Sequence, residues 1–131
     1  MVIDSSAILA LLMNEPEAEQ LAIAIDQAAI RRMSVANFLE ASIVIEARHG
    51  LAGGSKLDEL IEKAHISMEP VTVEQAEIAR IAYRAFGKGR HPAGLNFGDC
   101  FAYALAKTQN EPLLFKGDDF TKTDIQIAVN L

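Results

Sequence analysis

The chain opens with Met-Val-Ile-Asp-Ser-Ser over residues 1–6 and continues with Ala-Ile-Leu-Ala-Leu-Leu-Met over residues 7–13. The apolar run 1–3 is typical of a buried strand. It stops at Asp4, Ser5 and Ser6, whose side chains can accept hydrogen bonds from the free N–H groups at the start of a helix. The sequence therefore predicts a buried strand that leads directly into a helix over residues 7–13.

The same alternation continues along the chain. Pro16 suits the first turn of a helix that we expect to run to about residue 30. Helical or strand-like apolar spacing predicts further strands over residues 33–35, 66–72, 112–115 and 127–131, and further helices over residues 36–49, 56–64, 73–86 and 100–107. Gly50, Gly53 and Gly54 are expected to end one helix and Ser55 to cap the next. We therefore predict one α/β domain over residues 1–131, with a mainly parallel sheet of about four to five strands flanked by helices.

Composition narrows the class of protein. Half of the 131 residues are hydrophobic, which excludes a disordered chain, and the net charge of −6 disfavours a protein that binds nucleic acid by net positive charge. The single cysteine, Cys100, cannot close an intramolecular disulfide, and we expect a buried structural thiol. The longest apolar runs, 7–13 and 100–106, fall short of the roughly 18 residues that span a bilayer. With no signal-like start either, we expect no membrane association and a cytoplasmic location.

Four acidic positions stand out. Asp4 follows the first strand and the pair Asp118-Asp119 follows the strand 112–115, so both should lie where parallel strands end and ligands bind. Glu40 lies on the apolar face of its helix without a lysine or arginine within four residues, and Asp99 starts an apolar helix. Each also has a plainer interpretation. Asp4 and Asp99 can be helix caps, the aspartate pair a turn, and Glu40 the partner of a distant cation.

Together these carboxylates favour a metal site. Two carboxylates about 4 Å apart repel by about 4 kcal/mol at an effective dielectric of about 20, so a cation is needed to keep several ionised together. Oxygen ligands suit Mg²⁺ or Mn²⁺, and the scattered His49, His65 and His91 form no pair with zinc-ligand spacing. Such a site typically serves phosphoryl chemistry, so we expect a substrate that carries phosphate.

One segment can hold that substrate. Residues 78–98 contain basic but no acidic side chains, and Lys88, Arg90 and His91 stand in a glycine-rich loop that leads to Asp99. We predict that these three contact substrate. Arg80 and Arg84 fit equally well on a solvated helix face.

Four stretches in chain order resemble one family. They are Val-Ile-Asp-Ser-Ser-Ala at 2–7, Asn-Phe-Leu-Glu-Ala at 37–41, Asn-Phe-Gly-Asp-Cys-Phe-Ala-Tyr-Ala at 96–104 and Leu-Phe-Lys-Gly-Asp-Asp-Phe at 114–120. The chain resembles the PIN-domain ribonucleases and, more closely, the VapC toxins of bacterial toxin–antitoxin pairs. Ser5 stands where threonine is common in that family, and both residues carry a hydroxyl.

The resemblance implies a single PIN domain and a Mg²⁺- or Mn²⁺-dependent endoribonuclease that hydrolyses RNA phosphodiester bonds, with a structured RNA such as tRNA as substrate. Asp4, Glu40 and Asp99 match the three principal acidic positions of the family. Asp119 matches the fourth, with Asp118 in a variable place, and Ser6 matches a supporting hydroxyl. The implied partners are a cognate VapB-type antitoxin and a second copy of the chain in a homodimer.

Two other function classes fit the same residues. The chain can be a metal-dependent phosphoesterase acting on small substrates. Alternatively, it can be a non-catalytic interaction protein whose carboxylates cap helices and bind an arginine-rich partner.

Overall fold

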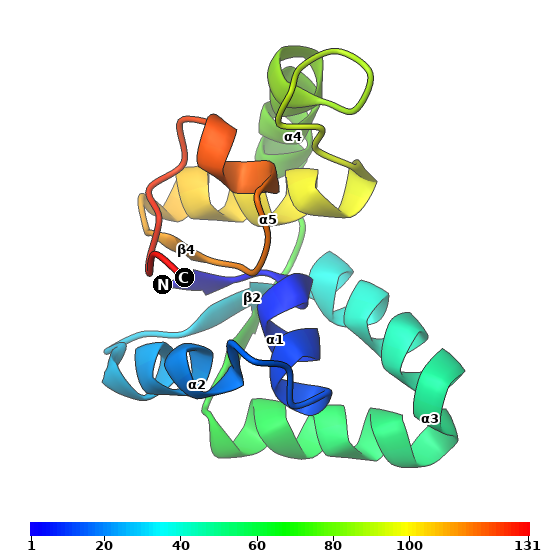
Figure 1. The fold of residues 1–131 in the computed structure, drawn as a ribbon. Helices are drawn as coiled ribbons and strands as arrows, with labels where there is room; N and C mark the ends of the chain where they lie inside the picture. Colours follow the sequence, from blue (N-terminus) through cyan, green and yellow to red (C-terminus); the bar gives the residue numbers. More distant parts are fainter.

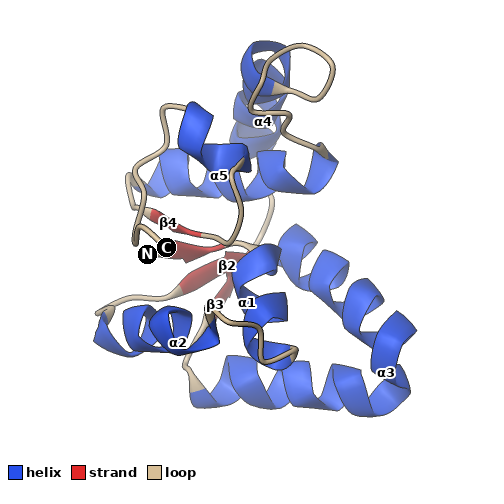
Figure 2. Ribbon diagram, in the orientation of Figure 1, coloured by secondary structure: helices blue, strands red, loops and turns tan.

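A computed structural model describes residues 1–131 and arranges them as one parallel sheet with helices on both faces (Figures 1 and 2). The strands are β1 (Val2–Ile3), β2 (Arg32–Ser34), β3 (Ser67–Glu69) and β4 (Leu113–Leu114), in the order β3-β2-β1-β4. Every neighbouring pair is parallel. The helices are α1 (Ser5–Leu12), α2 (Ala18–Gln27), α3 (Val35–Lys63), α4 (Val73–Phe86) and α5 (Phe97–Gln109), and a 3₁₀ turn, η1 (Asp119–Lys122), follows β4. The predicted α/β fold class is confirmed.

The sheet separates two apolar clusters. Helices α1, α2 and α3 cover one face and α4 and α5 cover the other (Figure 2). Successive strand side chains point to opposite faces, so Val2 packs with α4 and α5 whereas Ile3 packs with α1 to α3. Likewise, Leu113 packs with α4 and α5, and Leu114 packs with α1 to α3. All four side chains are fully buried. Burial on both faces explains why these short strands are apolar at every position.

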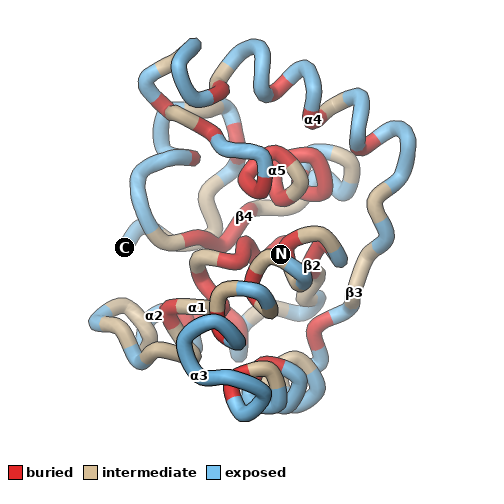
Figure 3. Tube along the Cα trace, turned by 90° about the vertical axis from the view of Figure 1, so that its right-hand side faces the viewer, coloured by how far each residue is buried: buried red, intermediate tan, exposed pale blue.

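Helix α5 lies in the interior, as its apolar sequence predicts (Figure 3). It begins at Phe97, three residues before the predicted start, because Asn96 caps it. Cys100 is buried within this helix. Burial, together with the charge of Asp99, raises the pKa of its thiol to about 11, so it is the predicted structural thiol.

Two predicted helix boundaries and one predicted strand are wrong for local reasons. The chain kinks at Gly50, whose φ of 64° favours glycine, and resumes the helix at once. Gly53 and Gly54 are therefore helical, and Ser55 lies inside the helix rather than capping it. The predicted strand 127–131 is a single bridge between Ile127 and Leu113.

No helix combines the length and the apolar character needed to cross a bilayer.

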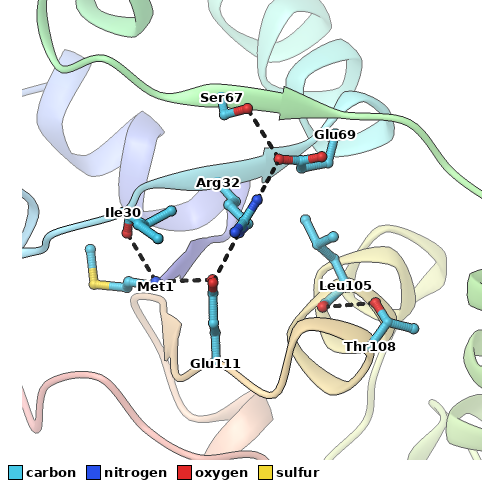
Figure 4. A network of polar contacts seen from close by, with 8 residues as sticks. All are labelled: Met1, Ile30, Arg32, Ser67, Glu69, Leu105, Thr108 and Glu111. Atoms are coloured by element: carbon cyan, nitrogen blue, oxygen red, sulfur yellow. Dashed lines mark hydrogen bonds and ion pairs between the residues drawn. The ribbon is translucent and has the colours of Figure 1, made fainter.

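A polar network, here called the amino-edge network, is formed by Arg32, Glu111 and the Met1 ammonium group at the amino ends of the strands, together with Glu69 (Figure 4). Glu69 is the last residue of β3, and its side chain reaches Arg32 at the start of β2. Arg32 donates from Nη1 to Glu69 Oε1 at 3.0 Å and from Nε to Glu111 Oε1 at 2.9 Å. The Met1 ammonium donates to Glu111 Oε2 at 3.0 Å. Every charge in this network therefore faces an opposite charge.

Candidate active site

The opposite edge, where the strands end, brings three helix starts together (Figure 1). Asp4 links β1 to α1, Ser34 links β2 to α3, and Asn96 precedes α5. Side-chain contacts connect all three starts: Ser5 donates to Glu40 of α3, and Asn37 of α3 donates to Gly98 O of α5. Segments distant in sequence therefore converge on one edge, here called the carboxyl edge.

Asp4 is 2% exposed and caps α1. Its Oδ2 accepts the Ser6 backbone N–H at 3.0 Å, while its Oδ1 is buried without a hydrogen-bond partner. Burial raises the pKa of Asp4 to about 6, against the opposing effect of hydrogen bonds with Ser6, and the charge of Glu40 raises it further. The plainer interpretation of Asp4 as a cap is thus correct, but capping satisfies only one of its two oxygens.

Asp99 lies in the first turn of α5 and shares a capping box with Asn96. Asn96 Oδ1 accepts the Asp99 N–H at 2.9 Å, and Asp99 Oδ2 accepts the Asn96 N–H at 3.0 Å. Asp99 is therefore not itself the N-cap of the plainer interpretation: Asn96 is the N-cap, and Asp99 is the third helical residue, which accepts from the N-cap backbone. Burial raises the pKa of Asp99 to about 7 although the bond from Asn96 lowers it, and the charges of Asp4, Asp119 and Glu40 add to the rise. The charges of the other three predicted acidic residues therefore all raise the pKa of Asp99.

Glu40 points from α3 toward the start of α1. Its Oε1 accepts hydrogen bonds from Ser5 Oγ and, at 3.3 Å, from Asn37 Nδ2. It forms no ion pair with lysine or arginine, so the structure contradicts the alternative of a distant pairing cation.

Asn37 was not predicted as a site residue, and Ser5 was predicted only as a residue that can cap a helix and that stands in place of threonine. Asn37 stands one helical turn before Glu40, on the same face of α3, and this spacing was the available signal.

Asp118 and Asp119 lie in the exposed turn after β4, and Asp119 begins η1. The turn is attached to α1, because Ser6 Oγ accepts the Lys116 N–H at 3.0 Å, and the Lys116 ammonium pairs with Glu15 and Glu17. The Ser6 hydroxyl therefore supports the segment that carries Asp119.

The three predicted substrate-binding residues lie in the loop between α4 and α5. Lys88 and Arg90 are exposed, and the Arg90 guanidinium lies 5.8 Å from the centre of the Tyr83 ring. His91 Nδ1 accepts the Ala93 N–H at 3.0 Å, and its ring packs edge-on against Phe86. No hydrogen bond or ion pair connects the side chains of these residues to the carboxylates. The contacts of His91 are structural ones within the loop.

The donor set fits a hard divalent cation. All four predicted acidic residues offer carboxylate oxygens, which Mg²⁺ and Mn²⁺ prefer. No three of these side chains are already gathered closely enough to hold an ion. However, the unpartnered Asp4 Oδ1 and the raised pKa values of Asp4 and Asp99 are features that a bound cation would relieve. The carboxyl edge therefore has the chemistry of a cation site.

Comparison with known proteins identifies the family. The sequence model of the PIN domain matches residues 1–126. The chain belongs to the PIN-domain family. It is 54% identical over 125 residues to ribonuclease VapC30 of Mycobacterium tuberculosis, covering 95% of each chain. It is also 53% identical over 125 residues to a ribonuclease VapC of Mycolicibacterium smegmatis, covering 95% of this chain and 97% of that protein.

A solved structure supports the fold. The crystal structure of M. tuberculosis VapC20, described as a sarcin-ricin loop cleaving toxin, matches with a TM-score of 0.80 at 14% identity, over 99% of this chain and 98% of that one. With these relatives, the predicted membership of the VapC type of PIN-domain ribonuclease is confirmed.

Proposed function

We propose that this PIN-domain chain is the toxin of a toxin–antitoxin pair and cleaves a structured RNA at the carboxyl edge, in a reaction that depends on Mg²⁺ or Mn²⁺. Asp4, Glu40, Asp99 and Asp119 are its site residues. The observation that carries this proposal is the accumulation of acidic side chains with which no lysine or arginine of the chain pairs. Asp4, Glu40 and Asp99 come from three different helix starts, two of them have raised pKa values, and none forms an ion pair.

Each residue has a role that its position supports. Asp4 and Asp99 hold the cation, since both are buried and Asp4 has a free oxygen. Glu40 and Asp119 complete the donor set, directly or through water. When bound, such an ion orients and deprotonates a water and neutralises charge on the phosphate. The chain itself fixes the directions of the carboxylates: Ser6 holds Oδ2 of Asp4, Asn96 holds Asp99, and Ser5 holds Glu40.

The substrate and location follow from the same family. VapC20 is described as cleaving the sarcin-ricin loop, which supports a structured RNA as the target here, tRNA being the example that the resemblance suggests. Lys88, Arg90 and His91 are proposed to contact it, since Lys88 and Arg90 are exposed on the loop that leads into α5. A cytoplasmic location is part of the proposal, because the RNA is there.

Two protein partners complete the proposal. One is a VapB-type antitoxin that places a basic side chain in the acidic site, where no lysine or arginine of this chain pairs with Asp4, Glu40 or Asp99. The other is a second copy of the chain. The surface available for a dimer contains the exposed apolar side chains of Leu39, Ile43 and Phe97, which line a hollow beside Glu40.

The deciding experiment measures cleavage of a structured RNA by the purified chain with Mn²⁺, with excess EDTA, and after Asp4→Asn plus Asp99→Asn. We expect cleavage only by the wild-type chain with metal. Equal cleavage in EDTA or by the double variant would contradict the proposal. Faster turnover of nucleotide monoesters than of RNA would favour a phosphoesterase, and no calorimetric Mn²⁺ binding at millimolar metal would favour a non-catalytic interaction protein.

A further inference from the structure

Gly98 leaves the space into which the Glu40 carboxylate fits. A Cβ built on Gly98 would lie 2.6 Å from Glu40 Cδ and 2.8 Å from Oε1, and nearer still to Oε2. The backbone of Gly98 is helical, so its φ angle is not the reason for a glycine there. Glycine inside a helix is also less favourable than alanine by roughly 0.5–1 kcal/mol. The missing side chain is therefore explained by the close approach of Glu40.

Asn37 connects the same two elements. Its side chain is fully buried, and its Nδ2 donates to Gly98 O at 2.9 Å and to Glu40 Oε1 at 3.3 Å. Its Oδ1 has no hydrogen-bond partner. A buried polar atom without a partner is destabilising. An apolar side chain would avoid that cost, so the two donated hydrogen bonds are what the asparagine contributes.

The two residues thus restrain one carboxylate from two sides. Gly98 permits Glu40 to rest against the first turn of α5, next to Asp99. Asn37 binds both that turn and the carboxylate, and Ser5 Oγ donates to the same oxygen from α1. Glu40 is therefore fixed relative to the elements that carry Asp4 and Asp99.

We propose that Gly98 and Asn37 are positioning residues that hold the Glu40 carboxylate toward the cation site at the carboxyl edge. The inference rests on the proposed function, because Glu40 is a site residue only there. It predicts that replacing either residue displaces the Glu40 carboxylate, and so lowers kcat and cation affinity, without changing the affinity for RNA.

The first test compares Gly98→Ala with Gly54→Ala. Both glycines are helical, and a Cβ on either would meet a glutamate carboxylate, that of Glu46 in the case of Gly54. Glu46 is exposed and can move away, whereas Glu40 is restrained by Ser5 and Asn37. We expect Gly98→Ala to lower kcat on a structured RNA by about tenfold or more with KM unchanged, as disturbed metal-site support does. Gly54→Ala should leave both constants unchanged.

A second readout does not depend on cleavage. Calorimetric titration with Mn²⁺ in the absence of RNA should show affinity reduced by about tenfold for Gly98→Ala and for Asn37→Leu. The leucine is close to asparagine in size, cannot donate to Glu40 and adds no charge to the site. Thermal unfolding of each variant checks that it is folded. If Asn37→Leu does not fold, Gly98→Ala decides alone, because alanine is the better helix former at that position.

A double-variant cycle separates the inference from the proposed function. In a Glu40→Ala background there is no carboxylate to displace, so adding Gly98→Ala should change neither kcat nor Mn²⁺ affinity further. If Glu40→Ala lowers both quantities but Gly98→Ala and Asn37→Leu lower neither, the positioning role is wrong and the site stands. An additive effect of Gly98→Ala in the Glu40→Ala background would also overturn it. If Glu40→Ala itself changes nothing, the role of Glu40 in the proposed site fails and the inference fails with it.

Discussion

At the amino edge of the sheet, Glu111 accepts hydrogen bonds from Arg32 and from the Met1 ammonium, whereas at the carboxyl edge the charges that act on Asp4 and Asp99 are those of other carboxylates. Partial burial raises the pKa of Glu111, but the hydrogen bonds from its cations outweigh this, and the pKa ends below its ordinary value. For Asp4 and Asp99, hydrogen bonds from Ser6 and Asn96 oppose the effect of burial but no cation does, and their pKa values rise. Both edges hold acidic side chains, but only the amino edge supplies their counter-charges.

This difference separates a structural from a functional use of charge. The amino-edge network ties β2, β3 and the segment before β4 together and leaves no charge for a ligand. The carboxyl edge keeps uncompensated negative charge that disfavours the folded chain by itself and favours it once a cation binds. Uncompensated charge at a defined edge is therefore what distinguishes the proposed active site.

The largest expected effect comes from removing one acid at the carboxyl edge and, for comparison, one in the amino-edge network. Asp99→Asn keeps the acceptor of the capping box but removes the charge, and we expect RNA cleavage to fall by at least about 100-fold. Glu69→Gln in the amino-edge network should leave cleavage by the folded protein unchanged. Initial rates at saturating Mn²⁺ measure both. Similar losses in the two variants would contradict the contrast between the edges.

The next expected effect separates two adjacent acids. Asp119→Asn should lower kcat by about tenfold or more, because the charge of Asp119 already acts on Asp99. Asp118→Asn, an identical change one residue earlier in the same exposed turn, should leave kcat within about twofold of wild type. The same cleavage assay compares the two variants. The reverse order would move the fourth acidic position to Asp118.

The pH dependence of stability without metal should reveal the raised pKa values. Between about pH 4, the unfolded pKa of aspartate, and pH 6 to 7, the folded chain holds more protons at Asp4 and Asp99 than the unfolded chain does. Their contribution to the free energy of unfolding therefore falls as pH rises through that window. Asp4→Asn plus Asp99→Asn should be more stable than wild type in EDTA by roughly 1–3 kcal/mol at pH 8, with a much smaller difference near pH 4. Urea unfolding at both pH values measures this, and a pH-independent difference would refute it.

Breaking the amino-edge network should affect stability alone. Arg32→Met leaves Glu69 and Glu111 without their shared cation, and we expect a loss of about 1–2 kcal/mol in the free energy of unfolding. The control is Lys63→Met, which breaks an exposed pair with Glu59 and should change little. Cleavage per folded molecule should stay at the wild-type value in both. A loss of kcat in Arg32→Met would show that the two edges are coupled.

The smallest expected effect concerns the loop between α4 and α5, which carries Lys88 and Arg90 and belongs to neither edge. Lys88→Gln plus Arg90→Gln should weaken RNA binding by about 3- to 10-fold at moderate salt and reduce the slope of log affinity against log salt by about 1–2. Lys56→Gln plus Lys63→Gln on α3 makes the same change in charge and serves as the control. Fluorescence titration in EDTA at several salt concentrations measures binding without cleavage. An unchanged slope would exclude these two residues as phosphate contacts.

Local signals predicted most of the fold and part of the site. Apolar runs that end in capping residues placed β1 before α1, and helical periodicity located α4 at its observed bounds. Glu40 stood out because a carboxylate on an apolar helix face needs a partner. The wrong boundaries came from positions where the backbone conformation of one residue sets the direction of the chain. At Gly50 the helix changes direction instead of ending.

The sequence by itself determined the alternation of strands and helices, the identity of the acidic residues and the resemblance to one family, because these depend on residue type and local spacing. Only the tertiary structure decided that the Glu40 carboxylate meets Ser5 from α1 and the backbone of Gly98 from α5. It also decided that Arg32 pairs with Glu69 and Glu111, whereas no lysine or arginine pairs with the acidic residues Asp4, Glu40 and Asp99 at the carboxyl edge. Charge compensation and close approach depend on distances between segments far apart in the chain, and the packing of helices on the sheet sets those distances.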